Sequence, residues 1–265
     1  MKFISIMADE RSGSTFAGTY AQYYGKKVFY IGELDNGLIR MVQGRNGTCS
    51  CGAKYLDCPV WGQIMLDVQK GVDLKKIIMK IQEITGAEVI VDSSKDISYH
   101  QKFRDIFGNN HSTIHIKRNP KGVILSRMKS RKRRIKKGNH PKPHIANKYN
   151  SMMIYDCITW SYRNSWMENF KIKGNNLDLT YDLLDVELPS KLLKFYKENE
   201  IEVEKKKKDD HIIMGNKFTR MGDIESDINV SHSWVNDLQL FQKVIVDVST
   251  LPVRLWYKYK FRKTA

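Results

Sequence analysis

Short runs of β-branched and aliphatic residues alternate with helical patterns along most of the chain. The runs that predict strands cover residues 2–7, 28–31, 89–92, 112–117 and 177–180. Between the second and third runs, Leu74, Ile77, Ile78 and Ile81 fall on one face of a helix, and Pro120 is well placed to open another helix after the fourth. This alternation predicts βαβ units, and therefore a parallel sheet covered by helices.

The length of the chain favours one domain. With 265 residues, of which 41% are hydrophobic, the chain can build one large core. We therefore expect a single α/β domain over residues 1–265, with a central parallel β-sheet flanked by helices. The spacing of Leu238, Phe241 and Ile245 predicts a further helix over residues 234–248.

Two segments interrupt the alternating pattern. Glycines and cysteines mark an irregular insert at about 44–61, and residues 130–148 have the composition of a basic loop punctuated by proline. The run 204–210, with four consecutive lysines, is interpreted as a solvated loop.

The charge of the chain is strongly positive. It has 45 Lys and Arg against 29 Asp and Glu, a formal charge of +16, and between Ile106 and Tyr155 there are thirteen basic residues and no acidic one. Such surfaces attract anionic partners, which include phosphate-bearing ligands, nucleic acid, anionic glycans and acidic membranes. The N-terminus lacks the pattern of a signal peptide, and no apolar run has the length of a membrane span. We expect a soluble, cytoplasmic protein. Peripheral contact with the inner face of the membrane stays open.

The loop after the first predicted strand has the composition of an anion site. Residues 8–15 read ADERSGST and run into a helix expected to begin near Thr15 or Phe16. A strand, a turn of small residues and a helix N-terminus together aim backbone N–H groups at one point. A nucleotide-hydrolysing P-loop would have Gly and Lys at the positions of Ala8 and Ser14. Arg11 lies inside this loop instead, where its planar cation can reach a phosphate or sulfate oxygen.

A second candidate anion site follows the fourth predicted strand. Arg118 stands at the carboxyl end of that strand, and Ser126 lies eight residues further on, in the helix that Pro120 opens. In doubly wound folds, ligands bind beyond the carboxyl ends of the strands. We therefore expect Arg118 and the loop around Arg11 to bind one ligand.

These two motifs together resemble the paired cofactor motifs of sulfotransferases that use 3′-phosphoadenosine 5′-phosphosulfate (PAPS). The resemblance is to a bacterial-type branch and spans about residues 2–234. Further matches occur in the expected order at 30–34, 49–52 with 58–61, 91–96, 181–183 and 211–220. It implies the P-loop-kinase-like sulfotransferase fold and transfer of a sulfuryl group from PAPS to an acceptor hydroxyl or amine, leaving adenosine 3′,5′-bisphosphate.

The resemblance also implies roles for individual residues. The first motif would cradle the 5′-phosphosulfate, and the 3′-phosphate would be held by Arg118 and Ser126 together with the last cofactor element, 215–220. The implied cofactor-binding residues are Arg11, Ser12, Gly13, Ser14, Thr15, Phe16, Arg118, Ser126, Lys217 and Arg220.

Three side chains are candidates for catalysis. Arg11 is the expected donor to the leaving phosphate, where charge builds up. Glu33, just beyond the second strand, is the favoured general base, because carbohydrate-modifying members of the family use a Glu at a similar place. Lys95 stands where small-molecule members often have a His, so it is a second candidate for contact with the transferring group or for the base. The alternative interpretations of Glu33 and Lys95 are a solvated carboxylate and a surface lysine.

The three cysteines of the irregular insert do not by themselves suggest a metal site. A structural zinc site takes four ligands, commonly with two residues between paired cysteines, whereas Cys49, Cys51 and Cys58 offer a C-x-C pair and one further thiol. We expect no metal there and interpret the insert as a packed loop facing the acceptor. His211 is expected to have a structural role, and Cys157 to be a small buried core residue.

The acceptor is expected to be a carbohydrate or a glycolipid, with no metal required for turnover. Two other functions stay open. A P-loop-type small-molecule kinase shares the βαβ plan, and the basic block at 117–148 is also compatible with nucleic-acid binding, although no recognised nucleic-acid motif accompanies it.

Overall fold

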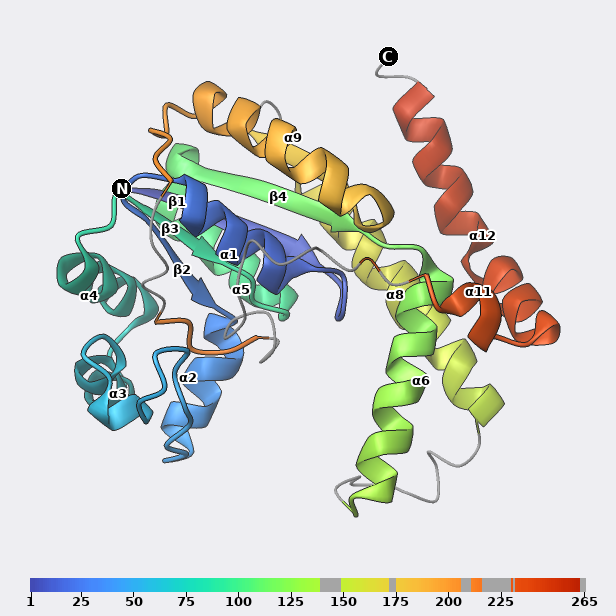
Figure 1. Cartoon of the computed structure of the whole chain (residues 1–265), viewed down its shortest axis with the longest axis horizontal. Coiled ribbons are helices and arrows are strands. Elements are labelled where there is room, and N and C mark those ends of the chain that lie inside the picture. The colour runs from blue at the N-terminus through green and yellow to red at the C-terminus, as the bar shows by residue number, and fades with distance from the viewer. Residues whose placement is uncertain (139–148, 172–174, 206–210, 216–229, 231, 263–265) are drawn as a thin grey trace.

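The computed structural model of the chain contains one five-stranded sheet. It describes all residues except 139–148, 172–174, 206–210, 216–229, 231 and 263–265. The strands are β1 (Lys2–Ala8), β2 (Val28–Gly32), β3 (Val89–Asp92), β4 (His111–Lys117) and β5 (Asn176–Thr180). They pair in the order β2-β3-β1-β4-β5, and every pair is parallel. All five predicted strands and the α/β fold class are thereby confirmed (Figure 1).

One face of the sheet is covered by α1 (Ser14–Tyr24) and α9 (Leu184–Glu198). Ala17 and Ala21 of α1, with Leu188 and Leu192 of α9, pack against the aliphatic side chains of the strands, such as Ile4. β1, β2 and β3 are buried on both faces, which explains why their sequences are nearly continuous apolar runs instead of alternating ones.

The other face carries most of the remaining helices of the N-terminal half. They are α2 (Leu34–Val42), α3 (Trp61–Gln69), α4 (Leu74–Thr85) and α5 (Ile97–Phe107). Their buried side chains form one cluster with Phe3, Phe29 and Ile90 of the sheet and with the irregular insert, whose Tyr55 is fully buried. The insert contains one short 3₁₀ turn, Tyr55–Asp57, and is otherwise irregular, as expected.

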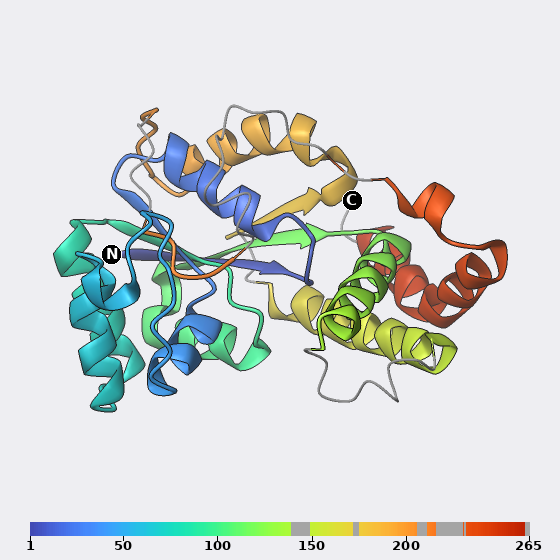
Figure 2. The ribbon, with the colours of Figure 1, turned by 60° about the horizontal axis from the view of Figure 1, so that its bottom comes forward.

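A separate group of helices lies mostly beyond the carboxyl ends of β1 and β4 (Figure 2). It comprises α6 (Pro120–Lys136), α8 (Tyr149–Phe170), α11 (Trp234–Asp237) and α12 (Leu240–Arg262). Their shared core includes Ile124, Met153 and Val246, together with Cys157, which is fully buried as predicted.

Two predictions about these helices are wrong. Residues 130–136 are not a loop, because α6 continues to Lys136; Lys and Arg are good helix formers, and their long side chains keep the charges in solvent. Residues 234–248 are not one helix, because the chain is extended at Leu238 between α11 and α12. No helix among the described residues is long and apolar enough to span a membrane.

The parallel arrangement brings the ends of all five strands to one edge of the sheet. From β1 the chain turns into α1 on one face and continues to β2, whereas from β3 it turns into α5 on the opposite face and continues to β4. The loops after the neighbouring strands β1 and β3 therefore lead to opposite faces of the sheet. Such a switch point is where open α/β sheets bind ligands.

Candidate active site

The loop after β1 ends at an uncapped helix N-terminus. Gly13, with a φ of 80°, precedes the first residue of α1, and no described side chain caps the helix. The first N–H groups of a helix have no acceptor inside it, so they remain available to an anion. The Ser12 Oγ atom is buried and has no hydrogen-bond partner among the described residues. α1 begins at Ser14, one residue before the predicted start.

Arg11 has a left-handed backbone conformation, with a φ of 63°. A residue with a Cβ atom rarely occupies this region, and such strain is found preferentially at functional sites. The conformation tightens the turn between β1 and α1. The strained backbone of Arg11 supports the expectation that this loop is a functional site.

Lys95 connects the loops after β3 and β1. Its Nζ atom donates to the Ser14 Oγ atom over 2.6 Å. Ser14 is the residue at the position where a P-loop would have its lysine, so the ammonium group at this place comes from another strand. Burial lowers the pKa of Lys95, and the nearby Glu33 opposes that effect.

Glu33 immediately follows β2 and is the N-cap residue of α2. Burial raises its pKa above that of an ordinary glutamate, while Lys95 and the amide of Asn36 act in the opposite direction. The Asn36 Nδ2 atom donates to Glu33 Oε2 over 2.9 Å. Glu33 is thus a half-buried carboxylate beside the half-buried Lys95, and neither is the fully solvated side chain of the alternative interpretation.

Two buried aspartates fix the loops that carry Glu33 and Lys95. The Asp35 Oδ2 atom accepts from the backbone N–H groups of Lys95 and Asp96 over 2.8 and 2.7 Å. The Asp92 Oδ1 atom accepts from the backbone of Leu34 over 3.1 Å. Burial and the proximity of Asp35 raise the pKa of Asp92 to about 7. These bonds join the ends of β2 and β3 and hold the two candidate catalytic groups in register.

Arg118 lies against the loop after β1, as the sequence predicted. Its Nη1 atom donates to the backbone oxygen of Arg11, and its guanidinium carbon lies 4.0 Å from the centre of the Tyr181 ring. Burial lowers its pKa. Ser126 is half-buried two turns into α6, whose N-terminus is capped by Asn119. The two predicted anion elements therefore meet.

Two of the expected cofactor-binding residues cannot be placed. Lys217 and Arg220 lie outside the described residues. The chain leading to them passes close to the loop after β1, because a Cβ atom added at Gly215 would lie only 2.9 Å from the Thr15 Oγ1 atom. Phe16, the last of the expected binding residues in the loop, is half-buried and packs against the core beneath α1.

Sequence reasoning missed a group of buried charges beside this loop. Asp9, only 2% exposed, accepts from Arg127 Nη2 over 2.7 Å, and Arg163 Nε lies 3.5 Å from the same Asp9 oxygen. Arg163 also donates to the backbone oxygen of Lys95 over 2.6 Å. α6 and α8 are thereby tied to both loops. An acidic residue directly after a buried strand was the one available indication in the sequence.

Comparisons with known proteins place this fold among sulfotransferase domains. The sulfotransferase domain from the curacin biosynthetic pathway superposes with a TM-score of 0.56 and 17% identity, covering 93% of this chain and 96% of that domain. The sulfotransferase domain of the Synechococcus PCC 7002 olefin synthase gives 0.52 and 18%, covering 93% of each chain. A sulfotransferase from Alicyclobacillus acidocaldarius gives 0.50 and 7%, with 94% and 91% covered.

The two comparisons of sequence found no similar protein. No protein-family model matches the chain, and no curated protein sequence is significantly similar to it. At these identities the structural likeness concerns the fold alone. The chain therefore has the sulfotransferase fold expected from its two anion motifs.

Proposed function

We propose that this protein is a sulfotransferase that uses PAPS as its donor. The observation that carries the proposal is the convergence of three loops at the switch point of the sheet, where Lys95 contacts Ser14 and Arg118 contacts the backbone of Arg11. A donor with a 5′-phosphosulfate and a separate 3′-phosphate needs two neighbouring anion-binding elements at the carboxyl ends of the strands. The sulfotransferase fold adds to this support.

The residues present fit such a donor. The uncapped N-terminus of α1 and the buried, unpartnered Ser12 hydroxyl suit the 5′ end, and Arg118 with Ser126 suits the 3′-phosphate. PAPS, when bound, supplies the sulfuryl group and a good leaving phosphate. Lys217 and Arg220 stay proposed contacts to the 3′-phosphate.

The chain's own groups account for the other requirements of the transfer. A Glu33 oxygen would take the proton of the acceptor as its oxygen attacks, and Lys95 Nζ and Arg11 would stabilise negative charge that develops at the phosphosulfate position. Lys95 is held by Ser14 on one side and by the backbone bonds to Asp35 and Arg163 on the other. Fixed charges of this kind need no reorganisation during the reaction.

We further propose a hydroxyl on a carbohydrate or glycolipid as the acceptor. Exposed basic side chains on the second half of α6, among them Arg133, Arg134 and Lys136, support an anionic acceptor or an acidic membrane surface as its carrier. Two of the structural neighbours belong to the curacin biosynthetic pathway and to an olefin synthase, so hydroxyl groups on biosynthetic intermediates belong in the same acceptor screen.

Titration calorimetry with adenosine 3′,5′-bisphosphate, AMP and ATP tests the donor. We expect the bisphosphate to bind at least tenfold more tightly than AMP, since each charge-assisted contact to the 3′-phosphate contributes about 1.5–3 kcal/mol. Equal affinity for AMP would exclude the PAPS assignment. Tight ATP binding that requires magnesium, with phosphate transfer, would instead establish the kinase alternative.

A further inference from the structure

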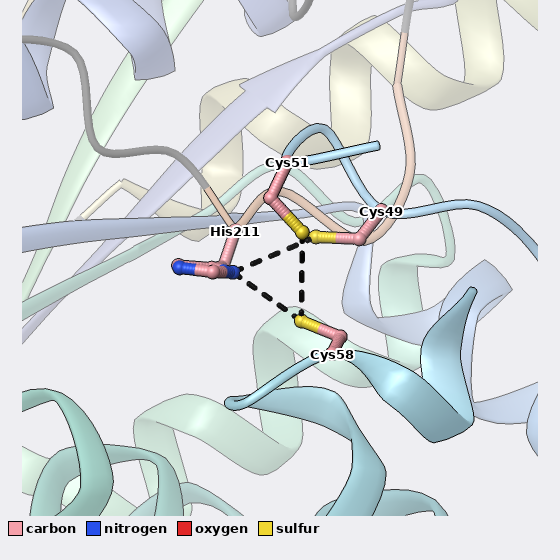
Figure 3. A group of neighbouring side chains, drawn as sticks. All are labelled: Cys49, Cys51, Cys58 and His211. Carbon is pink, nitrogen blue, oxygen red and sulfur yellow. Dashed lines mark hydrogen bonds between the residues drawn. The ribbon is translucent and has the colours of Figure 1, made fainter. Parts of the chain in front are cut away.

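Four potential metal ligands from two distant segments converge at one point (Figure 3). The thiols of Cys49, Cys51 and Cys58 come from the irregular insert, and the imidazole of His211 comes from a segment 153 residues beyond Cys58. Their ligand atoms all lie within 4.8 Å of one another. The fourth ligand that the cysteine spacing lacks is therefore supplied by the tertiary fold.

The distances suit a tetrahedral ion. Cys58 Sγ lies 3.3 Å from His211 Nδ1, Cys49 Sγ lies 3.9 Å from the same nitrogen, and Cys51 Sγ lies 3.9 Å from Cys58 Sγ. Zinc–sulfur bonds of about 2.3 Å give sulfur–sulfur edges of about 3.8 Å in a tetrahedron. A disulfide would require sulfurs about 2.05 Å apart, and all three thiols are free.

The backbone around the thiols presents them at one place. The Gly52 N–H donates to the Cys49 oxygen, and the Cys49 N–H donates to the Ala53 oxygen, closing a tight turn. Gly52 has a φ of 91°, a backbone conformation that glycine adopts readily and that this turn requires. The backbone N–H groups of Val60 and Trp61 lie close to the Cys58 sulfur. N–H groups in such positions orient metal ligands and stabilise thiolates.

His211 is held independently of its ring. Trp61 Nε1 donates to the His211 backbone oxygen over 2.5 Å. The next residue, Ile212, donates to Ser50 Oγ over 2.8 Å and accepts from the Ser50 backbone over 3.2 Å. The segment is thus fastened directly to the cysteine turn, with the imidazole directed at the thiols.

We propose that Cys49, Cys51, Cys58 and His211 bind a structural Zn²⁺ ion in this protein. Four protein ligands close the coordination shell, which is typical of structural sites, whereas catalytic zinc keeps an open position. Cys49 and Cys58 are almost fully buried, so the ion would be shielded from solvent on their side. The site replaces the expectation from sequence that the insert binds no metal.

A second group of candidate ligands is less suited to a metal ion. His115, Glu168 and Asp178 also lie close together. However, Lys117 and Lys171 contact both carboxylates, at distances of 2.6 to 3.9 Å. The positive charge that an ion would supply is already present there. Among the described residues, the Cys3His group is the stronger site.

The zinc site would fix a segment that leads into the candidate active site. Ile213 donates to the backbone of Ile31 in β2 over 3.0 Å, and Tyr55 donates to the Ile213 oxygen over 2.5 Å. Two residues later, Gly215 lies against Thr15 of the anion loop. An ion bound by His211 would therefore link the insert to segment 211–215, which leads to residues 216–220.

Metal analysis of the purified full-length chain tests the site. We expect one Zn²⁺ per chain by mass spectrometry, and, after exchange, the visible absorption of a tetrahedral Co²⁺–thiolate centre. Zinc removal by a chelator should lower the melting temperature, and added Zn²⁺ should restore it. Absence of bound zinc after purification with zinc present, together with no thiolate absorption on Co²⁺ titration, would overturn the proposal.

Three variants make the test specific to these ligands. Cys51→Ser, at the exposed thiol, should lose most of the metal, whereas Cys157→Ser, outside the group, should keep it. His211→Cys should retain a metal and shift the Co²⁺ spectrum toward that of four thiolates. Full zinc content in Cys51→Ser, or a Cys51–Cys58 disulfide found by peptide mass mapping, would exclude the site. If a variant does not fold, the Co²⁺ spectrum of the wild-type chain still decides.

Discussion

The Lys95 Nζ atom lies 2.6 Å from the Ser14 Oγ atom, so that a lysine after β3 reaches the position where a P-loop has its own lysine. Lys95 is half-buried between the diverging loops after β1 and β3, and its backbone is fixed by Asp35. A cation delivered from a neighbouring strand can serve the same anion as one delivered from the loop. The loop after β1 therefore has an ammonium group beside it without a lysine of its own.

Lys95→Met should lower kcat with little change in the binding of adenosine 3′,5′-bisphosphate. The ammonium group faces charge that develops in the transition state, so we expect a loss of about a hundredfold to a thousandfold. Lys102→Met, on the following helix, is the control and should have no effect. A Lys95→Met variant that weakened product binding and left kcat intact would assign Lys95 to ground-state binding.

Arg118→Ala and Arg11→Ala should affect different steps. Arg118→Ala removes the proposed charge-assisted contact to the 3′-phosphate and should weaken product binding about tenfold to a hundredfold in calorimetry. Arg11→Ala should mainly slow turnover. Arg133→Ala, on the exposed part of α6, serves as the control for loss of a positive charge. A rise in KM alone for Arg11→Ala would contradict its proposed role.

Turnover should not require a divalent metal in the active site. In the proposed mechanism, Arg11, Lys95 and the first-turn N–H groups of α1 would supply the positive charge that magnesium supplies in kinases. Brief EDTA treatment, too weak to remove buried zinc, should leave the rate of sulfuryl transfer unchanged. Loss of activity restored by magnesium would favour the kinase alternative. Loss restored only by zinc would point to the Cys3His site.

The parts of the fold that were predicted correctly follow from local sequence. β1, β2 and β3 are buried on both faces and have nearly continuous apolar sequences, whereas β5 alternates buried leucines with more exposed residues. All five runs rich in β-branched and aliphatic residues are strands. A basic run is ambiguous, because Lys and Arg suit both a solvated loop and an exposed helix. For that reason 130–136 was predicted as a loop, whereas those residues continue α6.

The site was predicted in part because its anion motifs are local, whereas its partners are not. Arg11 and Arg118 follow strands whose neighbourhood in a parallel sheet brings them together. By contrast, Asp9 meets Arg127 across 118 residues, and His211 meets Cys58 across 153. No spacing rule reports contacts at such separations, so the fourth ligand became visible only in the fold.

Acid should destabilise the protein partly through two buried histidines. Burial lowers the pKa of His100 to about 3 and of His111 to about 4. The unfolded state, with a histidine pKa of about 6.5, binds more protons between those values and 6.5. Each histidine therefore contributes stability that is complete above about pH 6.5 and is lost as the pH falls toward 3–4.

Denaturant unfolding at pH 7, 6 and 5 measures this effect. His111→Gln should have a slope of stability against pH smaller than that of the wild type by up to about 1.4 kcal/mol per pH unit. Asp92, whose pKa is raised to about 7, changes the slope of stability against pH in the opposite direction over the same pH range. The slope of each histidine variant is therefore compared with that of the wild type. An unchanged slope in both His100→Gln and His111→Gln would show that these residues do not titrate on unfolding.

Glu33→Gln is the decisive test of the general base. The substitution keeps the shape of the side chain and removes its basicity, so we expect kcat to fall about a hundredfold to ten-thousandfold while the affinity for adenosine 3′,5′-bisphosphate stays unchanged. Glu88→Gln, an exposed carboxylate before β3 at the opposite edge of the sheet, is the matched control. Near-normal turnover in Glu33→Gln would transfer the role to Lys95 or to another group.

The pH dependence of the rate separates Glu33 from Lys95 as the base. Burial raises the pKa of Glu33 and Lys95 opposes that rise, so kcat/KM should increase with pH through a value above the ordinary 4.3 of a glutamate. In Lys95→Met this acidic limb should move to higher pH, because the cation that favours the carboxylate is gone. In Glu33→Gln the limb should disappear. A limb that persists there and is absent in Lys95→Met would instead identify the neutral amine of Lys95 as the base, since it too acts in its deprotonated form.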